Sequence, residues 1–440
     1  MQCLHPLARS VASKSRLRTS FRDVLGLTHR YLHTGVPMAK SAGFATCELD
    51  AEPLHRYRAG GYHPLHLGDR LKAGRYEVLH KLGWGGYATV WLGKDHDLGL
   101  PVAMKVIVSE LCDENHEASM YHHVSCGPPE HPGRDKLPQM LDSFTFEGPN
   151  GVHQCLILEL LGASMSSMFE KYETNRLPSG LAWDVARQVV QATSYMHDMG
   201  IVHGDLHPGN IALLNPAILG KSAEEIVASM DAPATADVRA SDGERLTNHL
   251  PQYLVLPSAI PQPKSLTDCK VKVIDLGSAF LSDHHPSTMR MRCPLPYRAP
   301  EAVITSQWDK EADIWSLGCT IFALIVGYPP FDSFLFKEQE LVSQWIGTFG
   351  ELPSEWQGYS TLQDIDQAEL DVGSLTDWLR ETYYDDDRPP SLTDTDLERV
   401  GGLLLRLLQY RPSDRPSAGE ILLDPLFHPH TFRVDNLARQ

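Results

Sequence analysis

The sequence has no long hydrophobic run, no paired cysteines and fewer basic than acidic residues. No stretch of about 18 apolar residues occurs within its 440 residues, so we expect no membrane-spanning helix. Its 8 cysteines form no Cys-x-x-Cys pair, which argues against a disulfide framework or a zinc site. The formal net charge of −17 disfavours nonspecific binding of nucleic acid, and we expect no direct nucleic-acid contact.

The first 45 residues differ in composition from the rest of the chain. They are rich in arginine and serine, and Asp23 is their single acidic residue. This composition is typical of a mitochondrial transit peptide, and it fits a disordered basic extension equally well. Both interpretations of residues 1–45 therefore stay open.

Short β-type runs begin at Tyr76, whereas helical periodicity dominates later in the chain. We predict strands over residues 76–82, 89–94, 102–108, 137–146 and 153–160. We predict helices over residues 113–124, 181–199, 310–326, 337–348, 374–382, 393–408 and 417–422. Residues 215–268 are rich in alanine, serine and proline without sustained periodicity, which predicts a mostly irregular insertion.

Two short stretches carry most of the chemical information. The first is His203-Gly204-Asp205-Leu206-His207-Pro208-Gly209-Asn210, and the second is Val273-Ile274-Asp275-Leu276-Gly277. This spacing is typical of a phosphoryl-transfer site. Asp205 is the candidate base that accepts the proton of an incoming hydroxyl, and Asn210 and Asp275 are the candidate Mg²⁺ ligands.

A glycine-rich segment and a lysine upstream support the same interpretation. The run from Gly83 to Val90 lies between two predicted strands, where glycines let backbone N–H groups approach phosphates. Lys105 follows in the next predicted strand, and a lysine inside a strand is costly unless anions pair with it. We predict that Glu117 pairs with Lys105, with Glu114 as the alternative.

Further motifs occur in order toward the end of the chain. They are Tyr297-Arg298-Ala299-Pro300-Glu301, Ala312-Asp313-Ile314-Trp315-Ser316-Leu317-Gly318 and Arg415. Over about residues 62–427 the chain resembles the protein kinase family. The resemblance implies that Glu301 pairs with Arg415 and that Asp313 supports the backbone of the catalytic loop.

The resemblance also implies a bilobal α+β fold, with a small antiparallel β-sheet N-lobe carrying one helix and a larger, mostly α-helical C-lobe. We expect a kinase domain over residues 60–430, with the N-lobe at about 60–160 and the C-lobe at about 161–430. ATP and Mg²⁺ are the implied cofactors, with Leu158 as gatekeeper at the adenine pocket. The implied nucleotide contacts are Leu82, Gly83, Gly85, Gly86, Val90, Ala103, Lys105, Leu158, Glu159 and Leu161.

A narrower resemblance is to the SR-protein kinase group, especially its fungal members. It rests on the segment from Gly61 to Asp69, on Leu82-Gly83-Trp84-Gly85 and on the insertion before Asp275. It implies a monomeric serine/threonine kinase of the cytoplasm or nucleus that acts on Arg/Ser-rich splicing factors; a transit peptide would instead imply mitochondria. The acidic stretch from Asp364 to Glu398 is either a docking site for arginines or a solvated insert.

Three of the positions at which the sequence departs from the family bear on catalysis. His207 stands where family members usually carry lysine, Pro294 replaces a threonine that bridges to that lysine, and Gly204 replaces an arginine. We expect His207 to donate one hydrogen bond to a γ-phosphate oxygen without a permanent charge. Slower chemistry or a pH dependence near the histidine pKa of ~6.5 would follow.

Two rival functions remain. The loop at residues 203–210 also resembles small-molecule phosphotransferases of the aminoglycoside and choline kinase type, although those enzymes do not normally show the motif at Glu301 or the late Arg415. A pseudokinase scaffold without turnover is the other alternative, and His207 with Pro294 keeps it open.

Overall fold

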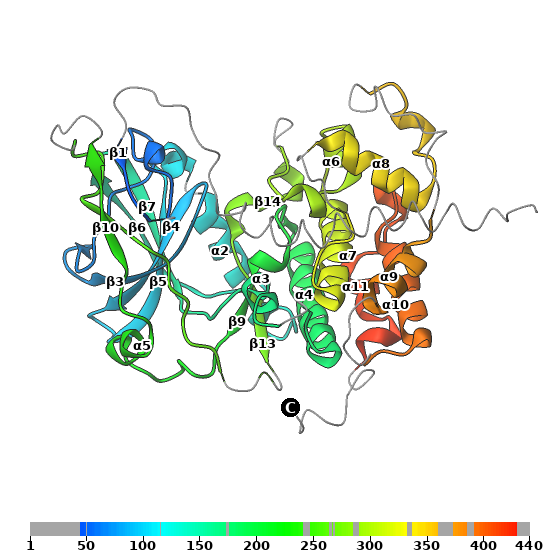
Figure 1. Cartoon of the computed structure of the whole chain (residues 1–440), viewed down its shortest axis with the longest axis horizontal. Helices are drawn as coiled ribbons and strands as arrows, with labels where there is room; N and C mark the ends of the chain where they lie inside the picture. Colours follow the sequence, from blue (N-terminus) through cyan, green and yellow to red (C-terminus); the bar gives the residue numbers. More distant parts are fainter. Residues whose placement is uncertain are drawn as a thin grey trace, which may run out of the picture.

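The computed structural model describes residues 45–49, 51–114, 116–172, 176–240, 247–263, 266, 269–284, 290–331, 337–359, 373–384 and 391–428. These residues fold into a strand-rich N-lobe and a mostly helical C-lobe (Figure 1). The predicted bilobal α+β class is confirmed. The predicted basic extension lies outside the described residues, apart from Ala45. Within the described part of the chain, no helix combines the length and apolarity needed to cross a bilayer.

The N-lobe is built on one antiparallel sheet with the strand order β2-β3-β4-β5-β7-β6. The register places Lys105, in β5, opposite Val90 on β4 and Leu156 on β7. Side chains alternate along β5, so Met104 packs into the sheet core while Lys105 points to the other face. The strands are β2 (Arg70–Leu71), β3 (Tyr76–Gly85), β4 (Ala88–Asp95), β5 (Leu100–Ile107), β6 (Met140–Gly148) and β7 (Gly151–Glu159).

One helix, α2 (His116–Ser125), lies between the sheet and the C-lobe (Figure 1). Its buried side includes Glu117, Tyr121 and Val124. The expected helix over residues 113–124 is therefore present from residue 116, after a 3₁₀ segment at Ser109–Glu114. This placement orients Glu117 toward β5.

The C-lobe packs around α7 (Lys310–Val326), whose side chains are buried from Ala312 to Val326. Its first residue donates its N–H to Asp309 at 2.7 Å, and Gly327 ends it with a φ of 101°. The bounds predicted for this helix are confirmed. The other helices are α3 (Met165–Phe169), α4 (Ser179–Asp198), α6 (Pro300–Ile304), α8 (Glu338–Phe349), α9 (Leu375–Tyr384), α10 (Asp394–Leu407) and α11 (Ala418–Leu422).

Two short strand pairs carry the motif residues at the edge of the C-lobe. β9 (Ile211–Leu214) pairs antiparallel with β13 (Lys270–Val273), and β8 (Ile201–Val202) pairs with β14 (Phe280–Leu281). Asn210 therefore precedes β9 at the same end of the pair at which β13 leads into Asp275. The chain leaves β9 for the insertion, and returns from it into β13, at the opposite end of this strand pair.

This insertion crosses to the N-lobe and packs there (Figure 1). It contains α5 (Ala223–Ser229), β10 (Thr235–Asp237), β11 (Arg239–Ala240) and β12 (Tyr253–Val255). β10 pairs with β12, and β11 pairs with β1 (Ala45–Thr46). Ile226 of α5 is fully buried in a cluster with Leu92 and Leu160.

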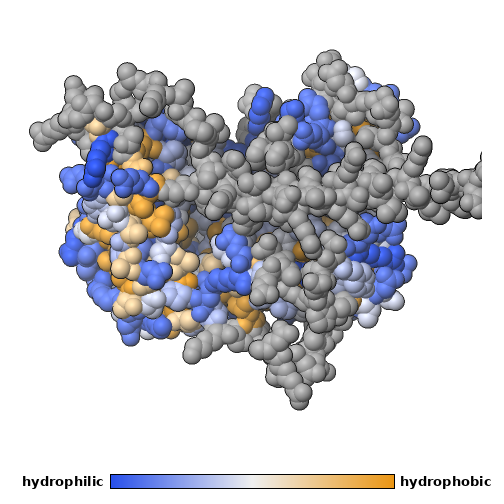
Figure 2. All heavy atoms as spheres, in the orientation of Figure 1, coloured by the Kyte–Doolittle hydropathy of each residue, from blue (hydrophilic) through white to orange (hydrophobic). Residues whose placement is uncertain are grey.

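Outside these short elements, the described backbone of the insertion is irregular. One expectation about the insertion was wrong, because it lies with the N-lobe although its sequence position falls within the predicted C-lobe range. The reason is that its apolar side chains Ile218, Ile226 and Ile260 are buried in one cluster with Leu92 and Leu160 of the N-lobe. The molecular surface in Figure 2 is mainly hydrophilic along the C-lobe edge that faces away from the N-lobe.

Candidate active site

The hairpin between β3 and β4 places the glycine-rich loop, and its tip has Gly85 opposite Ala88. A Cβ atom built on Gly83, Gly85 or Gly86 would meet no other atom within 4 Å. The glycines are therefore not required by packing within the protein. They leave backbone N–H groups open to a ligand, as expected of a phosphate-binding loop.

Lys105 lies at the centre of an ion-pair network in which the Glu117 side chain is buried and the Asp275 side chain is partly exposed. Its Nζ is 2.7 Å from Oε1 of Glu117 and 2.8 Å from Oδ1 of Asp275. Burial alone would lower the pKa of Lys105, but the charges of Asp275 and Glu117 outweigh it and raise this pKa. The predicted pair with Glu117 is present, and one ammonium group connects β5, α2 and Asp275, two residues after the end of β13.

Asp275 has an unusual backbone conformation, with a φ of 67°. Its Oδ1 accepts the Gly277 N–H at 3.1 Å, which fixes the local turn. Burial would raise the pKa of Asp275, but the Lys105 ammonium dominates and holds this pKa at about 2. Left-handed backbone at a residue other than glycine is uncommon and clusters at functional sites. The carboxylate is therefore ionised and held in one orientation.

The catalytic loop brings Asp205 and Asn210 together. The Asn210 side chain donates to the Asp205 carbonyl oxygen at 2.8 Å and to its Oδ2 at 3.1 Å. Among the described residues, the buried Oδ1 of Asp205 has no hydrogen-bond partner. Burial, followed by the negative charge of Asp275, raises the pKa of Asp205 to about 7. A carboxylate with one free oxygen and a raised pKa has the properties of a general base.

His207 lies beside this base and is held in one tautomer. Its Nδ1 accepts the Gly209 N–H at 3.1 Å, so Nε2 carries the proton and lies 3.5 Å from Oδ1 of Asp205. Burial and the neighbouring His203 lower the pKa of His207 to about 4. The imidazole is therefore neutral at physiological pH, and the pH dependence expected near 6.5 moves to lower pH.

Asp313 supports the loop from beneath, as the resemblance implied. Its two carboxylate oxygens accept the backbone N–H groups of His203 (2.7 Å) and Gly204 (2.9 Å). His197 also contacts it, with Nε2 at 3.0 Å from Oδ2. These bonds fix the backbone that carries Asp205.

Glu301 and Arg415 form the predicted ion pair. Both guanidinium nitrogens Nη1 and Nη2 bind the Glu301 carboxylate, at 2.6 and 2.7 Å. Arg415 also donates to backbone carbonyls and lies 5.3 Å from the centre of the Trp315 ring. The ion pair joins α6 to Arg415, near the C-terminal end of the C-lobe.

The hinge between the lobes is tied to the C-lobe by a side chain. The Glu159 carboxylate pairs with Lys272 of β13 and accepts the Gln139 N–H at 2.7 Å. Leu158 lies opposite Ala103 in the sheet register, on the strand next to Lys105. The adenine contacts through the backbones of Glu159 and Leu161 stay predictions.

The donor set fits a magnesium ion. Asp275 offers a carboxylate, and its side chain is 42% exposed. The Asn210 side chain bonds to Asp205 through its nitrogen, so these bonds do not use its amide oxygen. Oxygen ligands of this kind suit Mg²⁺, which keeps several waters and takes few protein ligands. Among the described residues, no group of three or more His, Cys, Asp or Glu side chains is placed so that it could hold a metal ion.

Residues 76–219 and 263–427 match the family model described as protein kinase domain, and the unmatched interval falls within the insertion. The chain belongs to the protein kinase family. This kinase is 27% identical over 424 residues to the "Serine/threonine-protein kinase SRPK" of Physarum polycephalum, covering 88% of this chain and 92% of that protein. It is 25% identical over 397 residues to "Protein kinase dsk1" of Schizosaccharomyces pombe, covering 70% and 72%.

A shorter match is to "SRSF protein kinase 3" of Homo sapiens, with 35% identity over 188 residues, 41% of this chain and 33% of that protein. The crystal structure of a kinase domain superposes with a TM-score of 0.57 at 21% identity, covering 82% of this kinase and 98% of that chain. This structural likeness supports the fold alone.

Arg292 is a site residue that the sequence did not reveal. Its guanidinium lies 4.4 Å from the centre of the Tyr87 ring at the tip of the glycine-rich loop. It also acts electrostatically on Asp205, whose raised pKa it lowers in part. An arginine in an irregular segment before Pro294 gives no periodic signal, and its place over the cleft follows from the tertiary fold.

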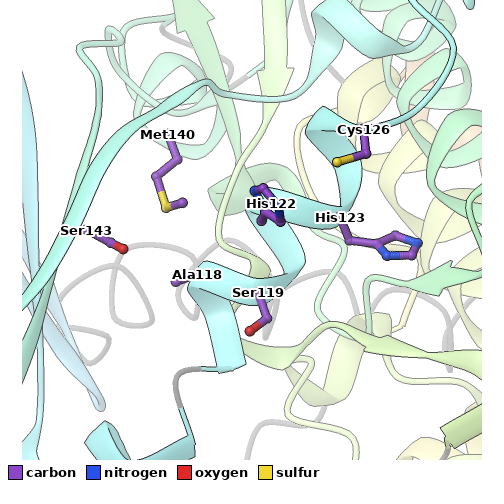
Figure 3. Close-up of a pocket in the computed structure, with 7 residues that line it drawn as sticks. All are labelled: Ala118, Ser119, His122, His123, Cys126, Met140 and Ser143. Atoms are coloured by element: carbon purple, nitrogen blue, oxygen red, sulfur yellow. The ribbon is translucent and has the colours of Figure 1, made fainter.

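A cavity on the far side of α2 lies outside the catalytic cleft (Figure 3). His122 of α2 and Cys126, just after that helix, line it together with Met140 and Ser143 of β6. His123 points away from these two strand residues in Figure 3, and its Nε2 contacts the Met199 carbonyl oxygen at 3.0 Å. Residues of the helix that carries Glu117 line the cavity, but none of the residues predicted for catalysis lines it.

Proposed function

We propose that this protein is an ATP- and Mg²⁺-dependent serine/threonine protein kinase. The observation that carries the proposal is the convergence of Lys105, Glu117, Asp205, Asn210 and Asp275 from four separate segments on one cleft. A lysine with two acids and a free carboxylate oxygen nearby is what a phosphoryl-transfer site needs. The names of its relatives support serine or threonine as the acceptor.

Each side chain has a role that follows from its position. Lys105, held by Glu117, would bind the α- and β-phosphates, which replace part of the anionic charge that now surrounds it. Asp275 and Asn210 would hold Mg²⁺, which neutralises charge on the phosphate oxygens. Asp205 Oδ1 would accept the proton of the substrate hydroxyl. His207 would donate its Nε2–H to a γ-phosphate oxygen.

We further propose Arg/Ser-rich proteins as substrates. The support is the similarity to kinases named for SR proteins and the formal net charge of −17, which attracts cationic partners. The acidic stretch from Asp364 to Glu398 lies largely outside the described residues. In its described part, Arg380 already pairs with Asp394 at 2.8 Å. We expect a monomer in the cytoplasm or nucleus, or in mitochondria if residues 1–45 form a transit peptide.

The pseudokinase alternative has one observation in its favour, the neutral His207 in place of lysine. The small-molecule phosphotransferase alternative is weaker, because the buried pair of Glu301 and Arg415 builds the segment that binds peptide substrates in protein kinases. Retention of the five charged and metal-binding groups favours turnover over a scaffold role.

Transfer of radiolabelled phosphate from ATP separates these functions. We expect labelling of an Arg/Ser peptide in preference to a generic basic protein, and no labelling of an aminoglycoside. Asp205→Asn should lower kcat by several orders of magnitude with nucleotide affinity largely kept, because only the base is removed. Nucleotide binding without transfer to any acceptor would support the pseudokinase instead.

A further inference from the structure

The tip of the glycine-rich loop is held by a segment that precedes the kinase sheet. The Tyr62 hydroxyl donates to the Gly85 carbonyl oxygen at 2.7 Å. Nη2 of Arg56 donates to the carbonyl oxygen of the next residue, Gly86, at 2.7 Å. The Arg56 guanidinium also lies 5.5 Å from the centre of the Tyr62 ring. Two adjacent peptide groups of the loop are thus fixed by two neighbouring side chains.

The opposite side of the tip is also restrained. The backbone N–H of Val108 donates to the Tyr87 carbonyl oxygen at 2.9 Å, and Arg292 stacks on the Tyr87 ring. Each of these groups binds a carbonyl oxygen or a side chain of the loop. None of these restraints uses a loop N–H group.

The segment that carries Arg56 and Tyr62 is itself rigidly attached. The Tyr62 N–H donates to the Arg56 carbonyl oxygen at 3.0 Å, and a Cβ atom on Gly61 would lie 1.8 Å from that oxygen. The Glu110 N–H donates to the Gly60 carbonyl oxygen at 2.7 Å, and the Glu110 carboxylate binds Arg56 at 3.0 Å. The turn is therefore closed on itself and bonded to the 3₁₀ segment that follows β5.

A buried ion pair anchors the same segment deeper in the lobe. Glu52 pairs with Lys81 of β3, and both side chains are almost completely buried. The Tyr57 hydroxyl donates to Glu52 at 2.5 Å, and its ring meets the Tyr62 ring edge-on at 5.5 Å. Residues 52–62, which we call the brace segment, therefore connect the strand before the glycine-rich loop to the loop tip.

We propose that the brace segment holds the glycine-rich loop in the conformation that receives the nucleotide triphosphate, and that Arg56 and Tyr62 are positioning residues for phosphoryl transfer. Glycines give a loop many conformations, and a ligand that must order them loses affinity. The brace segment orders them before the ligand arrives. This inference rests on the proposed function for the identity of the ligand. The brace segment lies before residue 76, where the match to the kinase family model begins.

The test compares Arg56→Met and Tyr62→Phe with Arg58→Met in the full-length chain. Arg58 is more exposed than Arg56 and contacts the same Glu110 at 3.6 Å, but among the described residues its side chain makes no hydrogen bond to the loop. Titration calorimetry should show that Arg56→Met and Tyr62→Phe each weaken Mg²⁺-ATP binding roughly three- to tenfold, a net loss typical of one hydrogen bond. Adenosine lacks phosphates, so its affinity should stay within about twofold in all variants.

Tyr62→Phe removes one oxygen atom and keeps the ring packing, so its fold should be retained. Hydrogen exchange of the amides from Gly85 to Ala88, measured without nucleotide, should accelerate in both variants and not in Arg58→Met. Equal weakening of ATP and adenosine, or unchanged ATP affinity with unchanged exchange, would overturn the inference. If the wild-type protein bound no ATP, the proposed function would fail, and the exchange rates alone would still decide whether the brace segment orders the loop.

Discussion

A single side chain, His207, distinguishes this catalytic loop chemically from that of most protein kinases. Its Nε2–H points toward Asp205 while Nδ1 is occupied by the Gly209 N–H. The site therefore has a neutral donor where the family usually has a cation. The replacement of lysine by histidine is visible in the sequence, and from it we predicted one hydrogen bond donated by His207 to a γ-phosphate oxygen. The sequence did not predict the low pKa, because burial beside His203 is a property of the folded loop.

We expect His207→Lys to raise kcat by about tenfold, since a charged donor stabilises the phosphoryl oxygens more strongly than a neutral one. Nucleotide affinity should change little, because the α- and β-phosphates are assigned to Lys105. Steady-state kinetics with an Arg/Ser peptide would measure both quantities. A lower kcat in this variant would show that the loop geometry is adapted to an imidazole.

Gly204 shows a different limit at the residue scale. The sequence shows that Gly204 replaces the arginine usual in the family, but it does not show why. Gly204 has a φ of 73°, and a Cβ atom there would lie 2.9 Å from the Trp308 ring and 3.0 Å from the Ser278 carbonyl oxygen. Any side chain at this position meets both a backbone penalty and a steric clash.

At the scale of the elements, the buried ion pair of Glu301 and Arg415 joins α6 to the C-terminal part of the C-lobe. Arg415→Met should destabilise the protein by about 3–5 kcal/mol, because it leaves the Glu301 carboxylate buried without a partner. Arg411→Met is the matched control: Arg411 binds Glu355 at 2.7 Å, but both side chains are about half exposed. That variant should lose no more than about 1 kcal/mol. Urea denaturation would compare them, and similar losses would contradict a special role for the buried pair.

Elements with strong local signals could be predicted from the sequence, and those stabilised by distant contacts could not. Asp309 and Gly327 mark the two ends of α7, and both caps are visible in the sequence. The capping box of Ser222 and Glu225 at the start of α5 was equally visible but lay in a segment interpreted as irregular. The short strands β10, β11 and β12 depend on pairing with partners far along the chain, which no local pattern reveals.

The candidate site was largely predictable because its residues occur in family motifs with fixed spacing. Lys105, Glu117, Asp205, Asn210 and Asp275 do meet in the structure as expected. Arg56 and Arg292 act on the loop from segments without such motifs, and Tyr62 lies in the stretch from Gly61 to Asp69, whose family resemblance assigned it no role. Their contribution depends on tertiary packing, so only the folded structure identifies them.

At the scale of the whole molecule, N-lobe histidines make stability depend on pH. Burial, then the neighbouring His153, lowers the pKa of His63 to about 4, against about 6.5 in an unfolded chain. Asp69 opposes this shift, and His66 adds to it. Between pH 6.5 and 4 the unfolded chain binds more protons, so stability falls as the pH is lowered through this range.

His63→Phe should reduce this acid-dependent loss by up to about 3 kcal/mol, given 1.36 kcal/mol per pKa unit. The Phe ring can keep the edge-on contact with Phe146, which His63 makes at 4.8 Å. The control is His55→Phe, which alters an exposed histidine of the same lobe. Urea unfolding monitored by tryptophan fluorescence at pH 4.5, 5.5 and 7 would give the slopes. Parallel pH profiles for wild type and His63→Phe would exclude this histidine as the cause.

The ion pair between Lys81 and Glu52 limits how far the chain can be truncated from its N-terminus. A fragment that began at residue 76, where the family match starts, would contain every catalytic residue but lose Glu52. The Lys81 ammonium would then remain inside the lobe without a counter-charge, at a cost of about 3–5 kcal/mol. Expression of the minimal catalytic region should therefore yield poorly folded material, whereas a start upstream of Glu52 should not.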